Sequence, residues 1–265
     1  MKESNETGIE KGSPDRFGHS WNIFSEILPI HEEQFKRWTQ GISTDMWKNK
    51  RFLDVGCGIG RNSYWAMTYG ASSARCIDVD NRTLSAAKKN LQPYPEAKVE
   101  FKSIYELESK DEFDICFSIG VIHHLEKPEV ALKKMYEATK PGGMALIWLY
   151  GYENNEWIVK YFNPFRKLLF SRLPLPIVYA MSLPLTAILW VLIRLVPVKI
   201  EYLKLLRKFS FKHIRAIVYD QMIPKIAHYY KKEEASGLLA DAGFKNIEVH
   251  WINEMSWSVV GYKTE

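Results

Sequence analysis

Short apolar runs alternate with helical patterns between residues 50 and 150 of the chain. The expected strands cover 52–55, 74–79, 99–103, 113–119 and 144–150, and the expected helices cover 62–69, 82–90 and 128–139. Strict alternation of this kind predicts an α/β fold in which helices cover both faces of a parallel sheet.

The turn after the first expected strand contains three alternating glycines, in the stretch LDVGCGIG at residues 53–60. A glycine inside an element costs roughly 0.5–1 kcal/mol relative to alanine, so Gly56, Gly58 and Gly60 need a reason. In a doubly wound sheet, the first strand-to-helix turn offers its backbone N–H groups to a ligand. Asp78 ends the second strand, where a carboxylate can accept hydrogen bonds from both ribose hydroxyls of a nucleoside.

The spacing of the glycines distinguishes a dinucleotide from other ligands that contain a nucleoside. The dinucleotide fingerprint is G-x-G-x-x-G, whereas this chain reads G-x-G-x-G followed by Arg61. Asp54 lies in the strand before the first glycine, where it suits a cationic group better than a pyrophosphate. S-adenosylmethionine carries an ammonium and a sulfonium but no phosphate, so it fits this pattern better.

Four motifs in order resemble those of the class I S-adenosylmethionine-dependent methyltransferases. LDVGCGIG is similar to the first motif, CIDVD to the ribose-binding strand end, FDICFSIGVIHHL to the fourth-strand motif and KPGGMALIWL to the next turn and strand. EEASGLLADAGFKNIEVHW resembles the last helix and the start of a terminal strand pair. The resemblance implies a Rossmann-like, doubly wound, mostly parallel seven-stranded sheet with an antiparallel last strand, and a largely helical cap insertion.

The resemblance also implies a set of cofactor-binding residues for S-adenosylmethionine. Asp54 would bind the methionine ammonium, directly or through water, and Asp78 would hold the ribose. Where the family often has an acidic residue near the adenine, this chain has Ser103 and Ile104, so apolar and backbone contacts are expected there. The full expected set is Asp54, Gly56, Cys57, Gly58, Asp78, Val79, Ile104, Ser118 and Ile119.

Methyl transfer to a hydroxyl or a protonated amine requires removal of a proton. His123 and His124 follow the fourth strand at the reactive end of the cofactor, and histidine titrates near neutrality. Either could be the base, or the pair could be structural, in which case His228 or Tyr229 is the alternative. No metal site is expected, because the three cysteines lack a suitable spacing.

Two additions to the core are expected to select the acceptor. The predicted division is a leader with substrate-side helices at 1–45, the cofactor-binding core at 46–150, a helical cap at 151–228, and the final helix and strand pair at 229–265. Aromatic and histidine side chains in these additions suit a pocket closed to water. The expected substrate-binding residues are His19, Trp21, His31, Tyr150 and Tyr229.

The insertion contains a strongly apolar stretch, RLPLPIVYAMSLPLTAILWVLIRLVPVKI. Proline inside a helix costs about 3 kcal/mol, so the prolines of this stretch are expected to divide it into short helices. Those helices should close over the strand ends, with their apolar face mostly buried. The region 173–200 could also contact a dimer partner or, peripherally, a bilayer surface, so both a monomer and a homodimer remain open.

Composition limits the remaining function classes. The formal net charge of +5 is mild, and no Lys/Arg block marks a nucleic-acid arm, so no nucleic-acid partner is expected. Three cysteines and the lack of a signal-like apolar segment near residue 1 favour a cytoplasmic enzyme. The resulting prediction is methyl transfer to oxygen or nitrogen of a small organic acceptor. The alternatives are a quinone precursor or lipid-linked sugar at the membrane, and a non-catalytic S-adenosylmethionine-binding module.

Overall fold

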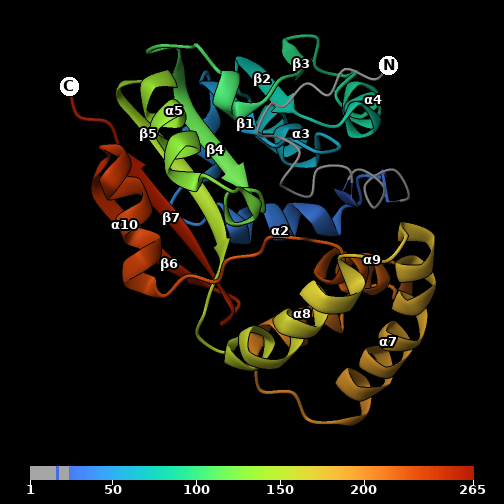
Figure 1. Cartoon of the computed structure of the whole chain (residues 1–265). Coiled ribbons are helices and arrows are strands. Elements are labelled where there is room, and N and C mark those ends of the chain that lie inside the picture. Colours follow the sequence, from blue (N-terminus) through green and yellow to red (C-terminus); the bar gives the residue numbers. More distant parts are fainter. Residues whose placement is uncertain (1–15, 18–23) are drawn as a thin grey trace, which may run out of the picture.

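A seven-stranded sheet forms the centre of the protein in the computed structural model, which describes residues 16–17 and 24–265 (Figure 1). The strand order is β3-β2-β1-β4-β5-β7-β6, and β7 alone runs antiparallel to its neighbours. The strands are β1 (Arg51–Val55), β2 (Ser73–Asp78), β3 (Ala97–Phe101), β4 (Phe113–Ile119), β5 (Thr139–Tyr150), β6 (Lys245–Ile252) and β7 (Ser256–Tyr262). The expected Rossmann-like sheet is confirmed.

Helices cover both faces of this sheet because its strands bury side chains on both sides. Along β1, Leu53 and Val55 belong to the cluster under α5 and α10, whereas Phe52 belongs to the cluster under α2, α3 and α4. The helical elements of the core are α2 (Ile30–Trp38), η1 (Thr44–Trp47), α3 (Arg61–Thr68), α4 (Asn81–Asn90), η2 (Ile104–Glu106), η3 (Ile122–His124), α5 (Pro128–Ala138) and α10 (Lys232–Ala242). The expected boundaries of the core elements lie close to these.

One core strand begins earlier than expected. β5 was expected at 144–150 but starts at Thr139, which pairs with Phe113 before an irregularity in the ladder. Gly143 has no room for a side chain there, because a Cβ would lie 2.9 Å from the carbonyl oxygen of Asp114. The early part of β5 therefore reflects close contact between two backbones rather than an apolar pattern.

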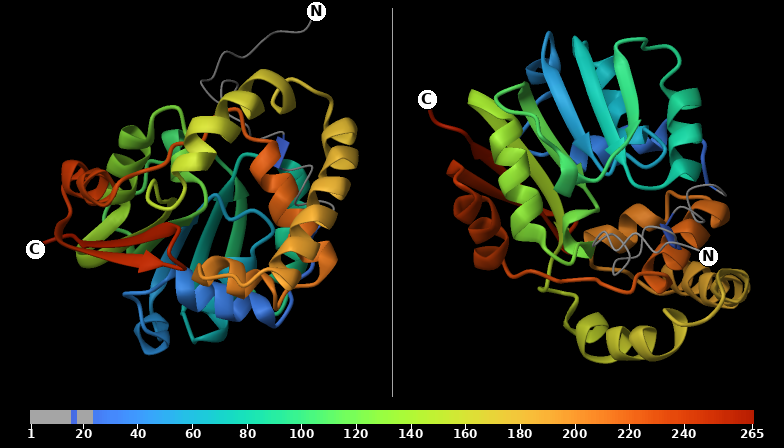
Figure 2. Two further views of the ribbon diagram at one scale, coloured as in Figure 1. Left: turned by 90° about the horizontal axis from the view of Figure 1, so that it is seen from below. Right: turned by 45° about the horizontal axis from the view of Figure 1, so that its top comes forward.

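The chain between β5 and α10 forms a helical cap, which we define as residues 151–228. Its helical elements are η4 (Ile158–Phe162), α6 (Asn163–Phe165), η5 (Arg166–Phe170), α7 (Leu175–Leu195), α8 (Glu201–Leu206) and α9 (Phe211–Met222), with η4 and η5 being π-helical turns. The cap and α2 surround the carboxyl ends of the strands when the molecule is viewed from below (Figure 2). The chain leaves and re-enters the core side by side, since Gly151 bridges Tyr230 and the Tyr230 N–H donates to the Tyr150 carbonyl.

The expectation that prolines divide the apolar stretch into short helices is wrong. α7 is a single helix of 21 residues. Pro174 caps it and Pro176 lies in its first turn, where helix N–H groups lack intrahelical partners in any case. Pro184 lies inside the helix and has no N–H to donate to the Ala180 carbonyl. On the neighbouring Tyr179 carbonyl, Arg215 of α9 donates at 2.9 Å and the Ser182 hydroxyl donates at 2.7 Å.

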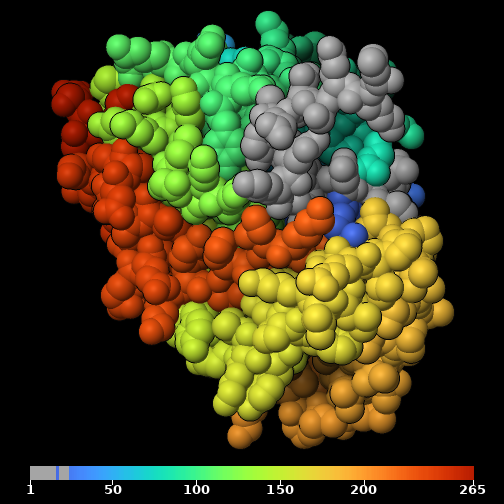
Figure 3. Space-filling model, in the orientation of Figure 1, coloured from blue at the N-terminus to red at the C-terminus, as the bar shows by residue number. Residues whose placement is uncertain are grey.

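The expectation that the apolar face of this stretch is mostly buried is also wrong. Only 22% of the most apolar window of α7 is buried, and the helix is long and apolar enough to cross a membrane by length and composition. In the space-filling view α7 is part of the lower right surface, next to the segment that precedes it (Figure 3). The exposed large apolar residues here are Ile177, Leu183, Leu185, Ile188, Val191, Leu192, Leu195 and Val196. The cap thus covers the strand ends while presenting an apolar outer face.

Candidate active site

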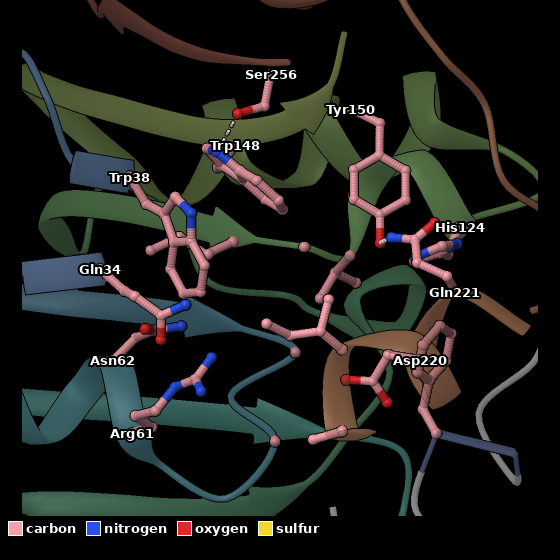
Figure 4. A pocket seen from close by; sticks show the side chains of 18 of the residues that line it. Gln34, Trp38, Arg61, Asn62, His124, Trp148, Tyr150, Asp220, Gln221 and Ser256 are labelled. Carbon is pink, nitrogen blue, oxygen red and sulfur yellow. Dashed lines mark hydrogen bonds between the residues drawn. The ribbon is translucent and has the colours of Figure 1, made fainter. Parts of the chain in front are cut away.

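A cavity of about 640 Å³ lies between the carboxyl ends of the strands and the cap. This volume is within the range of small-molecule sites, roughly 300–1,000 Å³. Side chains of α2 and α3 line one wall, including Gln34, Trp38 and Arg61, and His124 and Tyr150 stand on the opposite side (Figure 4). α7 contributes Leu185 and Leu189, so the cap completes the cavity rather than lying apart from it.

The glycine turn forms the part of the wall nearest β1. Gly56, Gly58 and Gly60 all have left-handed backbone conformations, with φ of 75°, 54° and 74°. A Cβ on Gly56 would lie 2.4 Å from Cγ2 of Val121, so no side chain fits. Gly56, Cys57 and Gly58 line the cavity, and the two glycines present bare backbone to it.

Asp78 lies beside this turn and is already held by backbone donors. The Gly58 N–H donates to its Oδ2 at 2.8 Å, and the Asp80 N–H donates to its Oδ1 at 3.0 Å. Burial raises the pKa of Asp78, although these hydrogen bonds oppose the shift. Asp78 lines the cavity together with Val79, Ile104 and Ile119, so four more predicted cofactor residues border the same space.

Two predicted cofactor residues lie behind the wall instead. Asp54 is 1% exposed, and its Oδ2 accepts a hydrogen bond from the Ser63 hydroxyl at 2.6 Å. Burial raises the pKa of Asp54 to about 7. Ser118 is also fully buried and donates to the Val55 carbonyl at 3.0 Å. The structure does not bring either side chain into the cavity, and both instead brace the ends of β1 and β4.

Polar side chains that the sequence did not single out as cofactor ligands stand next to the glycine turn. Gln34 Oε1 and Asn62 Oδ1 are buried without a hydrogen-bond partner among the described residues. Arg61 lies against the Trp38 ring at 5.3 Å, and burial lowers its pKa to about 10 while the charge of Asp220 opposes the shift. All of these side chains line the cavity. In the sequence, Arg61 and Asn62 come directly after the last glycine, and Gln34 lies one helical turn before Trp38. These positions were the signal that could have identified them.

His124 has the geometry of a proton acceptor at the opposite end. Its Nδ1 lies 2.6 Å from the Ile226 carbonyl, which can only accept, so Nδ1 carries the proton and Nε2 has the free lone pair. Burial lowers the pKa of His124 to about 3, so the ring is neutral at pH 7. Phe17 and Tyr150 flank it, with ring centroids 4.8 and 5.6 Å away.

The other two histidines predicted as bases do not reach the cavity wall. His123 is fully buried between the rings of His124 and Tyr150, and neither of its nitrogens has a partner among the described residues. His228 lies outside the wall, and burial lowers its pKa. Of the histidines predicted to act as bases, the geometry therefore favours His124.

Three of the five predicted substrate-binding residues line the cavity. They are His31, Tyr150 and Tyr229. His31 Nδ1 accepts from the Leu28 N–H at 3.0 Å, which leaves the proton on Nε2. His19 and Trp21 lie outside the described residues. No group of three His, Cys, Asp or Glu side chains suited to a metal ion occurs in the described part of the chain.

A chain of polar side chains runs through the aromatic end. Gln221 Nε2 donates to the Tyr150 hydroxyl oxygen at 2.9 Å, and the Tyr229 hydroxyl donates to Gln221 Oε1 at 3.4 Å. Burial raises the pKa of Tyr229 to about 12, so its hydroxyl is protonated at pH 7. Gln221 comes from α9, and its role could not be inferred before the cap was placed over the strand ends.

The sheet order, the glycine turn and the position of Asp78 define a Rossmann-like fold of the methyltransferase type. Residues 53–147 match the family model described as a methyltransferase domain. The resemblance to class I S-adenosylmethionine-dependent methyltransferases is thus confirmed at the level of fold and domain.

Curated relatives share this core with the chain. The ubiquinone biosynthesis O-methyltransferase of Dechloromonas aromatica is 31% identical over 144 residues, which cover 50% of this chain and 60% of the relative. Phosphoethanolamine N-methyltransferase 2 of Caenorhabditis elegans is 29% identical over 111 residues, covering 40% of this chain but 25% of the relative. The matched region is therefore a part of each relative.

A solved structure extends the likeness of fold over nearly the whole chain. Human N-acetylserotonin methyltransferase in complex with S-adenosylmethionine aligns with a TM-score of 0.57 at 13% identity. The alignment covers 99% of this chain and 60% of the human protein.

Proposed function

We propose that this protein transfers a methyl group from S-adenosylmethionine to an oxygen or nitrogen of a small organic acceptor. One observation carries the proposal: a single cavity joins the glycine turn and Asp78 to an aromatic end with a neutral histidine whose Nε2 is free. Cofactor and acceptor could therefore meet in one enclosed space, where positioning of the two reactants supplies much of the catalysis.

The residues next to the glycine turn fit the cofactor. Asp78 retains lone pairs for the ribose hydroxyls after accepting its two backbone hydrogen bonds, and Val79 and Ile104 offer apolar contact for the adenine. The orphaned oxygens of Gln34 and Asn62 suit the methionine ammonium, a role that we assign to them in place of Asp54. When bound, the cofactor supplies an electrophilic methyl group on a positively charged sulfur.

His124 would accept the proton of the acceptor. Because its Nδ1 is held by the Ile226 carbonyl, the ring cannot rotate to hide Nε2 without losing a hydrogen bond. The aromatic rings around it limit access of water to the reacting atoms.

The direct test is release of S-adenosylhomocysteine from S-adenosylmethionine with a panel of phenols, enols and primary amines. We expect release to depend on at least one acceptor of this panel. Calorimetric binding of S-adenosylmethionine without product formation from any acceptor class would contradict the enzymatic proposal and favour the non-catalytic binding module.

A second candidate is a methyltransferase that takes its acceptor at a membrane surface, such as a quinone precursor or a lipid-linked sugar. The exposed apolar face of the continuous helix α7 favours this candidate. Exposed basic side chains follow the helix at Lys199, Arg207 and Lys208, where they could meet anionic headgroups. The likeness to a ubiquinone biosynthesis O-methyltransferase agrees with an apolar acceptor of this kind.

Flotation with liposomes containing anionic lipid tests the membrane candidate. We expect the protein to float with the vesicles, and the double substitution Ile188→Asn and Leu195→Asn to reduce the bound fraction severalfold. Val130→Asn is a matched control, because Val130 is an exposed apolar residue on α5, away from the cap. Equal flotation of all three proteins, or none, would favour the acceptor being free in solution.

We propose a cytoplasmic location on either account, with the protein acting as a monomer or homodimer. The three cysteines are free and buried, which agrees with a reducing compartment. Light scattering with and without mild detergent would distinguish a defined dimer from association through α7.

A further inference from the structure

Arg166 has the largest fully buried charged side chain among the described residues of the cap, and its environment is unusual. The side chain is fully buried, and none of its three guanidinium nitrogens makes an aligned hydrogen bond with a described residue. Burying a charge costs several kcal/mol unless partners compensate for it. Such a residue is expected to have an ion-pair partner, yet no described carboxylate pairs with it.

The groups that face Arg166 all belong to the aromatic end of the cavity. The hydroxyl groups of Tyr229 and Tyr150 both lie near enough to the guanidinium to interact with its charge. The same charge lowers the pKa values of His123 and His124, which burial already depresses. The described titratable groups that interact with Arg166 are therefore phenols and neutral imidazoles.

A chain of hydrogen bonds leads from the Tyr229 hydroxyl, which lies near the guanidinium, into the cavity. The Tyr229 O–H donates to Gln221 Oε1, so its oxygen keeps its lone pairs on the side of the positive charge. Gln221 Nε2 then donates to the Tyr150 oxygen. The Tyr150 O–H remains as a free donor at the end of the chain, on the cavity wall.

We propose that the aromatic end of the cavity binds the acceptor through an ionised hydroxyl oxygen, which the Tyr150 O–H contacts and the buried charge of Arg166 stabilises. This proposal rests on the proposed function and narrows the acceptor to an acidic hydroxyl, such as a phenol or enol. One free donor suits one oxygen, and the rings of Trp148 and Tyr150 suit a flat acceptor.

The proton and the electron pairs of the proposed methyl transfer all have a destination at this end of the cavity. The acceptor O–H bond breaks, its proton passes to Nε2 of His124, and from there the proton goes to solvent, because burial and the charge of Arg166 keep the pKa of the ring low. The oxygen keeps the electron pair, forms the new O–C bond, and the S–C bond electrons return to sulfur as a neutral thioether.

A coloured phenol tests the proposal without turnover. The probe is 4-nitrophenol, whose ionised form absorbs visible light, titrated by pH in the presence of S-adenosylhomocysteine to fill the cofactor half. We expect the parent protein to lower the pKa of the bound probe by about one unit, a tenfold preference for the anion. Arg166→Met should remove that preference, and Arg166→Lys should keep part of it.

Controls separate a role in the site from a role in stability. Arg172→Met removes an exposed arginine of the same cap segment and should leave the probe titration unchanged. Arg166→Met should melt at the same temperature as the parent or higher, because it removes an uncompensated buried charge; a structural arginine would give a lower value. If Arg166→Met does not fold, Gln221→Leu breaks the same chain and should lose part of the preference for the anion.

Two results would overturn the proposal. One is an equal pKa of the bound probe in the parent and in Arg166→Met, and the other is a parent protein that binds only the neutral phenol or none. Failure of the proposed function gives a different pattern, in which no acceptor yields S-adenosylhomocysteine while the shift of the probe still depends on Arg166.

Discussion

The two ends of the cavity differ in how far their polar groups are paired within the protein. At the cofactor end, both oxygens of Asp78 accept backbone N–H groups, and Asp54 and Ser118 are bonded behind the wall. At the aromatic end, His123 and Arg166 are buried without aligned partners among the described residues. The unpartnered groups at the cofactor end are the neutral amide oxygens of Gln34 and Asn62, whereas those at the aromatic end include the charge of Arg166. The cofactor end is therefore largely preorganised, and the aromatic end is electrostatically incomplete.

This difference teaches how one cavity can serve two ligands. A preorganised end binds the same cofactor in every turnover with little rearrangement, since its donors and acceptors are fixed by the sheet. An end with unpartnered groups gains most from a ligand that supplies the missing charge or hydrogen bond. Selectivity for the acceptor should accordingly reside in the cap.

The sharpest test of this contrast is His124→Gln. Loss of a positioned base lowers turnover by about 10²–10⁴-fold. Because His124 is at the aromatic end, affinity for S-adenosylmethionine should stay near the parent value. His228→Gln is the matched control, since His228 lies outside the cavity wall. Equal losses in both variants would show that His124 has no special role.

The complementary change at the cofactor end is Asp78→Ala. We expect a loss of about 1.5–3 kcal/mol in the binding free energy of S-adenosylmethionine, the range for hydrogen bonds to a charged group. Isothermal titration calorimetry measures it, and circular dichroism checks the fold. Unchanged affinity in a folded variant would remove Asp78 from the site.

Preorganisation of the glycine turn can be tested by Gly56→Ala. A left-handed conformation costs a non-glycine residue about 1–2 kcal/mol, and the contact with Val121 adds to it. Urea denaturation should therefore give a stability loss of at least this size. Gly237→Ala is a control, because Gly237 lies within α10 and a Cβ there meets nothing within 4 Å. A neutral Gly56→Ala would show that the turn can adjust.

The aromatic end also makes stability depend on pH. The pKa of His124 is about 3 in the folded protein against an ordinary 6.5, so the unfolded chain binds more protons between these values. Neutral His124 therefore contributes to the free energy of unfolding above pH 6.5, and this contribution is lost as the pH falls from 6.5 towards about 3. His124→Gln should reduce the pH slope of the unfolding free energy by about 1.4 kcal/mol per unit. Equal pH slopes in the parent and in His124→Gln would contradict the lowered pKa of His124.

The core was predictable because its signals are local. The order of strands and helices follows from apolar periodicity, and the glycines mark the turn through their own backbone needs. The directions in which the Asp54 and Ser118 side chains point could not be predicted from the local sequence. Each depends on a partner elsewhere, which is Ser63 for the first and the Val55 carbonyl for the second. Motif identity alone therefore predicted both residues as cofactor ligands, and their side chains lie behind the cavity wall.

The cap resisted prediction for a related reason. Whether Pro184 interrupts a helix depends on the packing around it, and Arg215 of α9 contacts this part of the helix at the Tyr179 carbonyl. The burial of Arg166 likewise arises only once the cap is folded over Tyr150 and Tyr229. Such contacts join residues that the sequence pattern treats independently.

The bridge between Gly151 and Tyr230 has a consequence for how this protein can be redesigned. Because the two ends of the cap are hydrogen-bonded to each other, the insertion is a loop whose ends are held at a fixed separation next to the sheet. The entropy of closing a loop changes only slowly with its length, by about 0.6 kcal/mol per doubling. The cap is thus an exchangeable module: helices could be lengthened, removed or taken from another protein while β5 and α10 keep their positions.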